Sequence, residues 1–343
     1  MILAGGVGSR FWPVSTPTRP KQILPLAGDR PLIADTVERI RPLIPIERIR
    51  VLTGAELVGP IRATIPTLEE QHFLTEPQAR GTAPVLLWAA HRFAAEDGAA
   101  IMISLHADHA IRPGNAFREL IAIAVEAAER HDRLFALGIR PTRPETGYGY
   151  IRRGTALDDA GAWSVDAFVE KPDPETARRY LESGAYLWNS GIFVWRATRF
   201  LEEVRAHTPE LASLLPLLDG GDVSGFFQGA PNLSVDRGVL ERSGRVGVME
   251  ATFEWDDVGT WDAVARARAA DPHGNVRCGD ARVIDGAGCV VWNEGPEPVV
   301  VFGARDLVVV RVRGVTLVLP RDRAADLKEL LAALPDEIRE VQP

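Results

Sequence analysis

Short β-branched runs alternate with longer helical patterns through the first 140 residues of the chain. In 82–95 the apolar residues recur at steps of three and four, which predicts an amphipathic helix, and 117–130 contains few helix breakers. This alternation favours a Rossmann-like α/β fold, in which a mixed, mostly parallel sheet is flanked by helices. The predicted strands are 2–4, 49–53, 72–75, 100–105 and 134–139.

From residue 147 to residue 192 the alternation loosens, which predicts an inserted region for substrate binding. It contains one predicted helix, 174–183, and the pattern of the following segment, 197–218, is also helical. The strands predicted in the inserted region are 148–152, 165–170 and 191–195.

The residue pattern changes near the end of the chain. Turn residues at 271–275 precede near-continuous Val/Leu runs, which predict strands of a small β domain. A helix from about residue 323 has leucines on one face, which we expect to dock on the body. The predicted domains are therefore a catalytic domain, 1–270, and a small β-helix-like domain with a terminal helix, 271–343. The Val/Leu runs are 298–302, 307–312 and 315–319, and the leucines are Leu327, Leu330, Leu331 and Leu334.

Composition excludes several classes of protein. The net charge of −8, with basic residues thinly spread, gives no general attraction to nucleic acid. Two cysteines, Cys278 and Cys289, are too few for a disulfide framework and lack metal-ligand spacing. No stretch has the length and apolarity of a membrane span or a signal peptide. We therefore expect a cytoplasmic protein without nucleic-acid or membrane partners.

A glycine cluster follows the first predicted strand. Residues 3–13 read LAGGVGSRFWP, and RPKQ follows at 19–22. Glycines let the backbone approach a polyphosphate closely, and Arg10 and Lys21 add cationic donors for it. A bulky ring stands where the dinucleotide-binding fingerprint needs a small residue, and no Walker lysine follows. A plain tight turn is the structural alternative.

This loop resembles the signature of the sugar-nucleotide pyrophosphorylases, and its FWP and PKQ variants resemble the mannose-1-phosphate guanylyltransferase branch. The resemblance extends to EPQARGTAP at 76–84, which enters a predicted helix with Thr82 as a candidate N-cap. Ala79 stands where that family usually has asparagine. The nucleotide-binding residues that the resemblance implies are Leu3, Ala4, Gly5, Gly6, Gly8, Arg10, Lys21, Gln78, Arg80, Gly81, Thr82 and Asp108.

Two aspartates match the family's magnesium ligands. Asp108 lies in LHADH, the segment at the end of the predicted strand 100–105, and Asp257 lies in EWDDVGTW before a predicted helix at 261–269. Carboxylate oxygens suit Mg²⁺, which also needs phosphate oxygens, although either aspartate could instead cap a turn or helix. His106 replaces the family's more usual proline, and we expect His109 to form local hydrogen bonds.

The sugar half of the site is implied by later motifs. They are ETGYGY at 145–150, FVEKP at 168–172, WNSGIF at 188–193 and SVDRGVLE at 234–241. Each could be a surface turn alone, but they occur together and in the family's order. The sugar-binding residues implied are Tyr148, Gly149, Glu170, Lys171, Asn189 and Asp236.

The resemblance covers about residues 1–335 and implies transfer of GMP from GTP to mannose 1-phosphate, with Arg10, Lys21, Asp108, Lys171 and Asp257 as catalytic residues. A sugar phosphate is already anionic, so no general base is required. The alternatives are a heptose 1-phosphate guanylyltransferase, a hexose 1-phosphate thymidylyltransferase and a non-catalytic nucleotide-sugar sensor. The length leaves no room for the isomerase module of some relatives, so we expect transferase activity alone. Met1 lies directly at the first predicted strand, where relatives usually have a few more residues, so we expect an upstream start codon. We also expect a homodimer.

Overall fold

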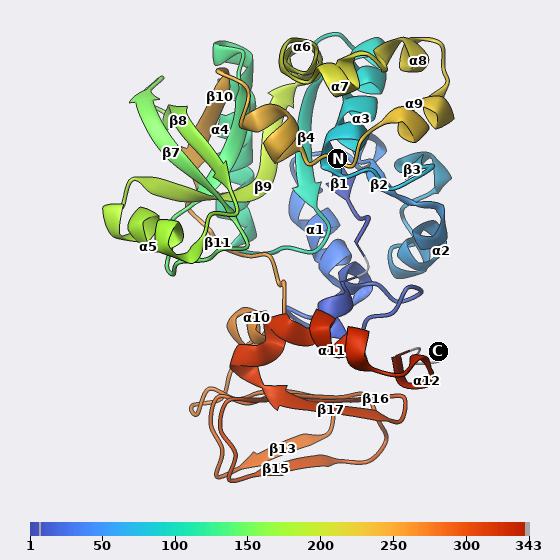
Figure 1. Cartoon of the computed structure of the whole chain (residues 1–343), viewed down its shortest axis with the longest axis vertical. Helices are drawn as coiled ribbons and strands as arrows, with labels where there is room; N and C mark the ends of the chain where they lie inside the picture. The colour runs from blue at the N-terminus through green and yellow to red at the C-terminus, as the bar shows by residue number, and fades with distance from the viewer. Residues whose placement is uncertain (7, 340–343) are drawn as a thin grey trace.

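The computed structural model describes residues 1–6 and 8–339. A nine-stranded sheet with the order β3-β2-β1-β4-β9-β6-β10-β8-β7 forms the larger body, at the top of Figure 1. Its strands are β1 (Ile2–Leu3), β2 (Val51–Gly54), β3 (Phe73–Glu76), β4 (Ile101–His106), β6 (Leu134–Ile139), β7 (Gly149–Ala156), β8 (Ala162–Glu170), β9 (Tyr186–Arg196) and β10 (Val246–Glu250).

The sheet is parallel in its first half and mixed in its second. Strands β3, β2, β1 and β4 pair in parallel, and β9 then runs antiparallel between β4 and β6. Leu3 is in register with Leu52 and His106, so the loops after β1, β2 and β4 leave the same edge of the sheet. The carboxyl ends of parallel strands are where such sheets bind ligands.

Helices cover both faces of this sheet. One apolar cluster packs α1, α2 and α4 on one face, and another packs α3 and α6 on the opposite face. The two clusters are separate because successive strand residues, such as Ile2 and Leu3, point to opposite faces. The helices are α1 (Leu32–Ile40), α2 (Ala55–Thr64), α3 (Thr82–Glu96), α4 (Gly114–His131), α5 (Pro174–Ser183) and α6 (Ala197–His207).

The helical segment predicted at 197–218 is not continuous. It divides into α6, α7 (Pro209–Ala212) and α8 (Leu215–Asp219), and α9 (Val223–Gly229) follows. Pro209 and Pro216 lie in the first turns of α7 and α8, because a proline has no N–H to donate within a longer helix.

A small β domain forms the lower part of Figure 1. Its parallel strands pair in successive coils, as in a β-helix, and antiparallel β17 closes the larger wall. One wall contains β12 (Val276–Cys278), β14 (Val290–Asn293), β16 (Leu307–Val312) and β17 (Val315–Pro320), and the other contains β13 (Ala281–Ile284) and β15 (Val299–Phe302).

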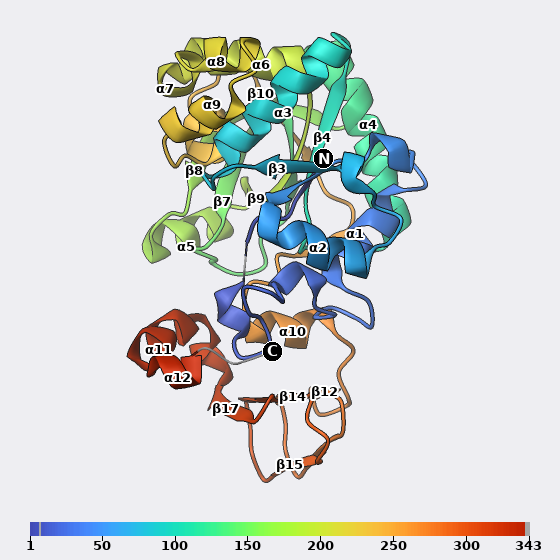
Figure 2. The ribbon, with the colours of Figure 1, turned by 90° about the vertical axis from the view of Figure 1, so that its right-hand side faces the viewer.

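The terminal helix docks where the sequence predicted. A 3₁₀ segment at Arg321–Asp326 precedes α11 (Leu327–Ala333), so the α-helix begins four residues later than residue 323, and α12 (Asp336–Arg339) follows. Leu327 is buried, and Leu330, Leu331 and Leu334 pack against the same cluster. Figure 2 shows α10 (Trp261–Ala267) and α11 between the β domain and the larger body.

This third apolar cluster joins the two parts of the chain. It contains Phe11 and Trp12 from the loop after β1, Trp261 from α10 and Trp292 from β14. Arg19 forms two hydrogen bonds of 2.6 and 3.0 Å with Glu294 across the same junction.

Within the described residues, no helix is both long and apolar enough to cross a membrane.

Candidate active site

Lys21 connects three separate segments at the edge of the sheet. Its Nζ donates to Asp108 Oδ2 at 2.7 Å and to the Asp257 carbonyl at 2.6 Å. Gly8 has φ 74°, and a Cβ at this position would lie only 2.3 Å from Lys21 Cβ. Glycine therefore permits both the left-handed backbone and the close approach of the lysine stem.

The pKa values of the two aspartates are shifted in opposite directions. Burial alone would raise the pKa of Asp108, but the Lys21 ammonium outweighs it and holds that pKa well below its usual range. Burial raises the pKa of Asp257, although Lys21 and the Tyr148 hydroxyl oppose it. That hydroxyl donates to Asp257 Oδ1 at 2.6 Å.

An antiparallel pair of short strands, next to the aspartates in the sequence, brings the two aspartates together. Strand β5 (Ala110–Arg112) pairs antiparallel with β11 (Glu254–Asp256), and Ala110 lies opposite Asp256. Asp108 comes just before β5, and Asp257 follows β11 directly. We call β5 and β11 the β5–β11 ribbon.

The donors near Lys21 fit a hard divalent cation. The ligand atoms of His106, Asp108 and His109 lie within 4.8 Å of one another. However, His109 Nδ1 accepts a hydrogen bond of 3.1 Å from Trp255 Nε1, so a neutral ring keeps its proton on Nε2. Burial lowers the pKa of His109 well below its ordinary value, which favours this neutral ring. Asp108 and Asp257 offer the carboxylate oxygens that a hard cation prefers, and His109 forms the local hydrogen bond that we expected.

A pocket of about 290 Å³ opens beside β1. The first glycines of the loop, the start of α3 and the end of β4 line it. It therefore lies at the edge of the sheet where a nucleotide was predicted to bind. The predicted residues that line it are Leu3, Ala4, Gly5, Gly6, Gly81, Thr82 and Asp108.

Five predicted nucleotide-binding residues do not line this pocket: Gly8, Arg10, Lys21, Gln78 and Arg80. Arg10 and Gln78 are exposed. Arg80 donates to the carbonyls of Phe227 and Gln228 at 3.1 and 3.3 Å, so its charge neutralises the end of α9.

Thr82 is not the N-cap of α3. Gly81 caps the helix, with φ 79°, and Thr82 is the first helical residue. The Thr82 hydroxyl instead accepts from the Val235 N–H at 2.9 Å. This bond links the nucleotide-side helix to the segment that carries Asp236.

A second pocket, of about 210 Å³, adjoins the first and shares Leu3, Thr82 and His106 with it. Asn189 Nδ2 donates to Asp236 Oδ1 at 2.8 Å, and Lys171 Nζ to Glu170 Oε1 at 2.7 Å. All six predicted sugar-binding residues, with Asp257, line it: Tyr148, Gly149, Glu170, Lys171, Asn189 and Asp236.

Asp236 should make the stability of the fold depend on pH. Burial, followed by the nearby Glu170, raises its pKa from 3.8 to about 6. The ionised form is disfavoured in the fold, so the cost to stability increases as pH rises from about 4 to about 6 and is complete above that. The cost reaches about 3 kcal/mol at pH 7.5 and falls to about 1 kcal/mol at pH 4.5.

Asp236→Asn should therefore raise the melting temperature at pH 7.5, because the amide still accepts from Asn189 and carries no charge. The gain should shrink at pH 4.5. Melting curves of both proteins at the two pH values test this, with Glu175→Gln on the exposed face of α5 as a control. An equal shift at both pH values would contradict the assigned pKa.

Several residues of these pockets lie in the motifs quoted above but were given no role from the sequence. Gln22 Nε2 donates to the Ala4 carbonyl at 3.0 Å and fixes the turn after β1. Glu76 lines the nucleotide pocket at the end of β3, and Trp255 lines the sugar pocket. Position at a strand end was the available signal for Glu76, since it applied equally to Asp108.

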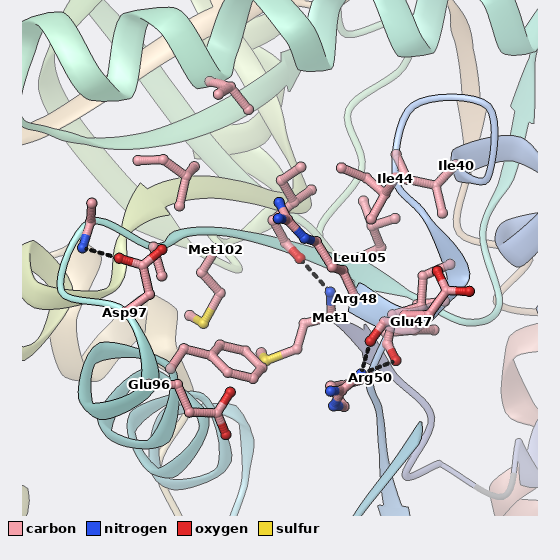
Figure 3. A pocket seen from close by; sticks show the side chains of 18 of the residues that line it. Met1, Ile40, Ile44, Glu47, Arg48, Arg50, Glu96, Asp97, Met102 and Leu105 are labelled. Atoms are coloured by element: carbon pink, nitrogen blue, oxygen red, sulfur yellow. Dashed lines mark hydrogen bonds between the residues drawn. The ribbon is translucent and has the colours of Figure 1, made fainter. Parts of the chain in front are cut away.

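A larger pocket, of about 570 Å³, lies at the opposite edge of the sheet. Figure 3 shows Met1, Met102 and Leu105 around it, with Arg48 and Arg50 at one side. It lies at the amino ends of β1, β2 and β4 and contains none of the predicted catalytic residues. Its position away from the strand carboxyl ends separates it from the candidate active site.

The fold and the paired pockets define a nucleotidyltransferase. Residues 1–273 match the family model described as nucleotidyl transferase, and 279–334 match the MannoseP isomerase/GMP-like beta-helix domain. The chain belongs to the mannose-1-phosphate guanylyltransferases of the nucleotidyl transferase family.

Three similar proteins illustrate this membership. The alginate biosynthesis protein AlgA of Pseudomonas aeruginosa is 36% identical over 97% of this chain and 71% of its own length. The mannose-1-phosphate guanylyltransferase of Klebsiella pneumoniae is 35% identical over 99% and 74%. The crystal structure of mannose-1-phosphate geranyltransferase from Thermus thermophilus is 37% identical, with a TM-score of 0.86 over 97% of both chains.

Proposed function

We propose that the chain transfers GMP from GTP to mannose 1-phosphate and releases pyrophosphate. The observation that carries this proposal is the pair of adjoining pockets, which meet at Leu3, Thr82 and His106. Lys21 joins Asp108 to the Asp257 backbone at this junction. A nucleotide in one pocket and a sugar phosphate in the other would bring their phosphates together there.

The nucleotide pocket has an acceptor suited to guanine. Glu76 lies against the loop after β1, with Oε1 3.3 Å from where a Gly5 Cβ would be. Guanine presents an N–H and an amino group on one edge, and a carboxylate can accept from both. Backbone groups of 3–6 and 78–82 would complete base recognition.

The reaction needs placement and charge neutralisation from this chain. An anionic oxygen of the sugar phosphate attacks the α-phosphorus in line, and pyrophosphate leaves. Lys21, Arg10 and Lys171 are the cations that would offset the phosphate charges. Mg²⁺ held by Asp108 and Asp257 would supply further stabilisation of the charge that moves to pyrophosphate.

A substrate panel tests the proposal. Pyrophosphate release is measured with GTP, ATP, UTP and dTTP against mannose 1-phosphate, and then with heptose and glucose 1-phosphates against the best nucleotide. GTP with mannose 1-phosphate should have the highest kcat/KM. Equal turnover with dTTP would exclude the guanylyltransferase assignment, and no turnover with any pair would favour the nucleotide-sugar sensor.

Lys171→Ala should weaken the use of the sugar phosphate. Lys171 is exposed at the mouth of the sugar pocket, where its ammonium is paired with Glu170 and can meet a phosphate. Loss of a charge-assisted contact should raise KM for mannose 1-phosphate about tenfold or more, with little change in GTP affinity. Calorimetry with each ligand measures both; lost GTP binding with intact sugar phosphate binding would reverse our division of the site.

Three further features belong to the same proposal. We place the boundary between catalytic and β domains at 270/271, next to the turn before β12. We also propose a cytoplasmic location and a homodimer, without nucleic-acid or membrane partners. The net charge of −8 supports the absence of nucleic acid.

A further inference from the structure

A pocket of about 320 Å³ lies behind the loop that carries Asp108. It is formed where α1 and the start of α4 lie side by side (Figure 2). Arg39 from α1 and Arg112 from the β5–β11 ribbon face into it, together with the back of His109. None of the substrate roles proposed above uses these arginines.

Arg39 brings a charge with no directly paired carboxylate into this pocket, and its guanidinium lies over the Phe117 ring, 5.7 Å from the centroid. It is only 8% exposed, and its hydrogen bonds are to the His109 carbonyl at 3.3 Å and to the Thr36 hydroxyl at 3.5 Å. Burial, with Arg112 as a like charge nearby, lowers the pKa of Arg39 to about 10, although Asp35 opposes the shift. A buried cation is expensive unless an anion balances it.

The acidic side chains of the pocket are engaged elsewhere. Asp35 pairs with Arg30 at 2.8 Å, and Glu38 pairs with Arg41 at 2.9 Å. In the part of the chain that the structure describes, no carboxylate oxygen lies within 4.0 Å of Arg39 or Arg112. Arg112 donates to the Ala27 carbonyl at 2.7 Å and remains exposed on its other side.

The start of α4 adds further donors. This helix of 18 residues begins at Gly114, which lines the pocket, and has no side-chain cap. Its first N–H groups and the positive end of its dipole favour an anion, and two guanidinium groups favour a phosphate in particular. The volume leaves room for a small organic group as well as the phosphate.

We propose that this pocket binds a phosphate monoester, and that its binding changes the activity at the candidate active site. The route is short. Arg39 holds the carbonyl of His109, next to Asp108, and Arg112 lies on the ribbon whose other strand leads into Asp257. A phosphate that draws the two guanidinium groups together would shift both aspartates relative to Lys21.

Calorimetry with glycerol 3-phosphate tests binding apart from the proposed reaction. Lys171→Ala removes the cation that we place beside the sugar phosphate, and the Arg112 variants identify the binding that belongs to the pocket of Arg39 and Arg112. In that background, Arg112→Gln should weaken binding at least about tenfold, because it removes a charge but keeps a donor for Ala27. Arg112→Lys should retain most of the affinity. Arg30→Gln is the matched control, since Arg30 lines the same pocket but is neutralised by Asp35.

Kinetics tests the coupling. With Lys171 intact and both substrates saturating, glycerol 3-phosphate should change kcat at least twofold, and Arg112→Gln should abolish the change while leaving basal kcat within about twofold. Inorganic phosphate should bind more weakly than the ester. The proposal is overturned by unchanged binding in Arg112→Gln, by a purely competitive effect, or by equal binding of inorganic phosphate. If the chain proves to have no transferase activity, the calorimetric result still decides the binding site.

Discussion

Asp108→Asn and Asp257→Asn should each lower turnover at least about 100-fold, because each removes a carboxylate that we propose as a metal ligand and keeps its shape. The structure adds a way to separate their effects on stability. Lys21 lowers the pKa of Asp108, so the ionised Asp108 carboxylate stabilises the fold at neutral pH. Burial raises the pKa of Asp257, so the ionised Asp257 carboxylate does not stabilise the fold. Asp108→Asn should therefore lower the melting temperature at pH 7, and Asp257→Asn should not.

Turnover as a function of Mg²⁺ concentration, measured beside thermal melting, checks both expectations. Asp256→Asn is a suitable control, because the Asp256 carboxylate pairs with Arg266 rather than facing Lys21. Its turnover should remain within about tenfold of the wild type. If the Asp108 and Asp257 variants kept near-normal rates and melting temperatures, both carboxylates would be structural caps and the two-aspartate mechanism would have to be abandoned.

Gly8→Ala should inactivate the protein almost as strongly, although it adds one methyl group outside both pockets. The new Cβ would lie 2.3 Å from Lys21 Cβ, and the backbone φ of 74° is unfavourable for alanine. The strain and the clash should cost about 2–4 kcal/mol of unfolding free energy. Relief of the clash would move the Lys21 ammonium from Asp108, which should lower turnover at least about 100-fold.

Gly6→Ala is the matched control. Gly6 lies two residues earlier in the same loop, and a Cβ there meets no atom within 4 Å. Denaturant unfolding should give Gly6→Ala a stability near that of the wild type and Gly8→Ala a clear loss. Equal stability of the two variants would show that Lys21 can accommodate the methyl group.

The ends of the first five predicted strands were the most predictable part of this fold, whereas β7, β8 and β9 extend three to five residues beyond the predicted 148–152, 165–170 and 191–195. The predicted strand 134–139 coincides with β6, and β1 to β4 begin and end within two residues of their predictions. Apolar runs and turn residues determine these limits locally. The same topology explains part of the sugar pocket, since Tyr148, Gly149, Glu170 and Lys171 lie at or beside the ends of β7 and β8. Asn189 lies within β9 and Asp236 begins a π-helical turn, so their places in this pocket depend on tertiary packing.

Directions of long charged side chains were not predictable in this way. Arg80 lies within a predicted binding motif, yet it bonds to carbonyls at the end of α9, whose position depends on the tertiary packing of α6 to α9. Lys21 was expected to hold phosphate, and its bonds to Asp108 and the Asp257 backbone were not foreseen. A sequence identifies a donor, but its partner depends on segments far away along the chain.

The cluster that joins Phe11 and Trp12 to Trp261 and Trp292 has a consequence for how this family can be rearranged. The loop that carries Gly8 obtains much of its apolar support from the C-terminal part of the chain. Replacing the β-helix with that of another relative would change the apolar residues that pack against the loop after β1. The wall of β13 and β15 lies away from this junction and could tolerate exchange. Recombination between relatives should therefore succeed within the outer coils and fail at the junction, even though the sequence looks modular there.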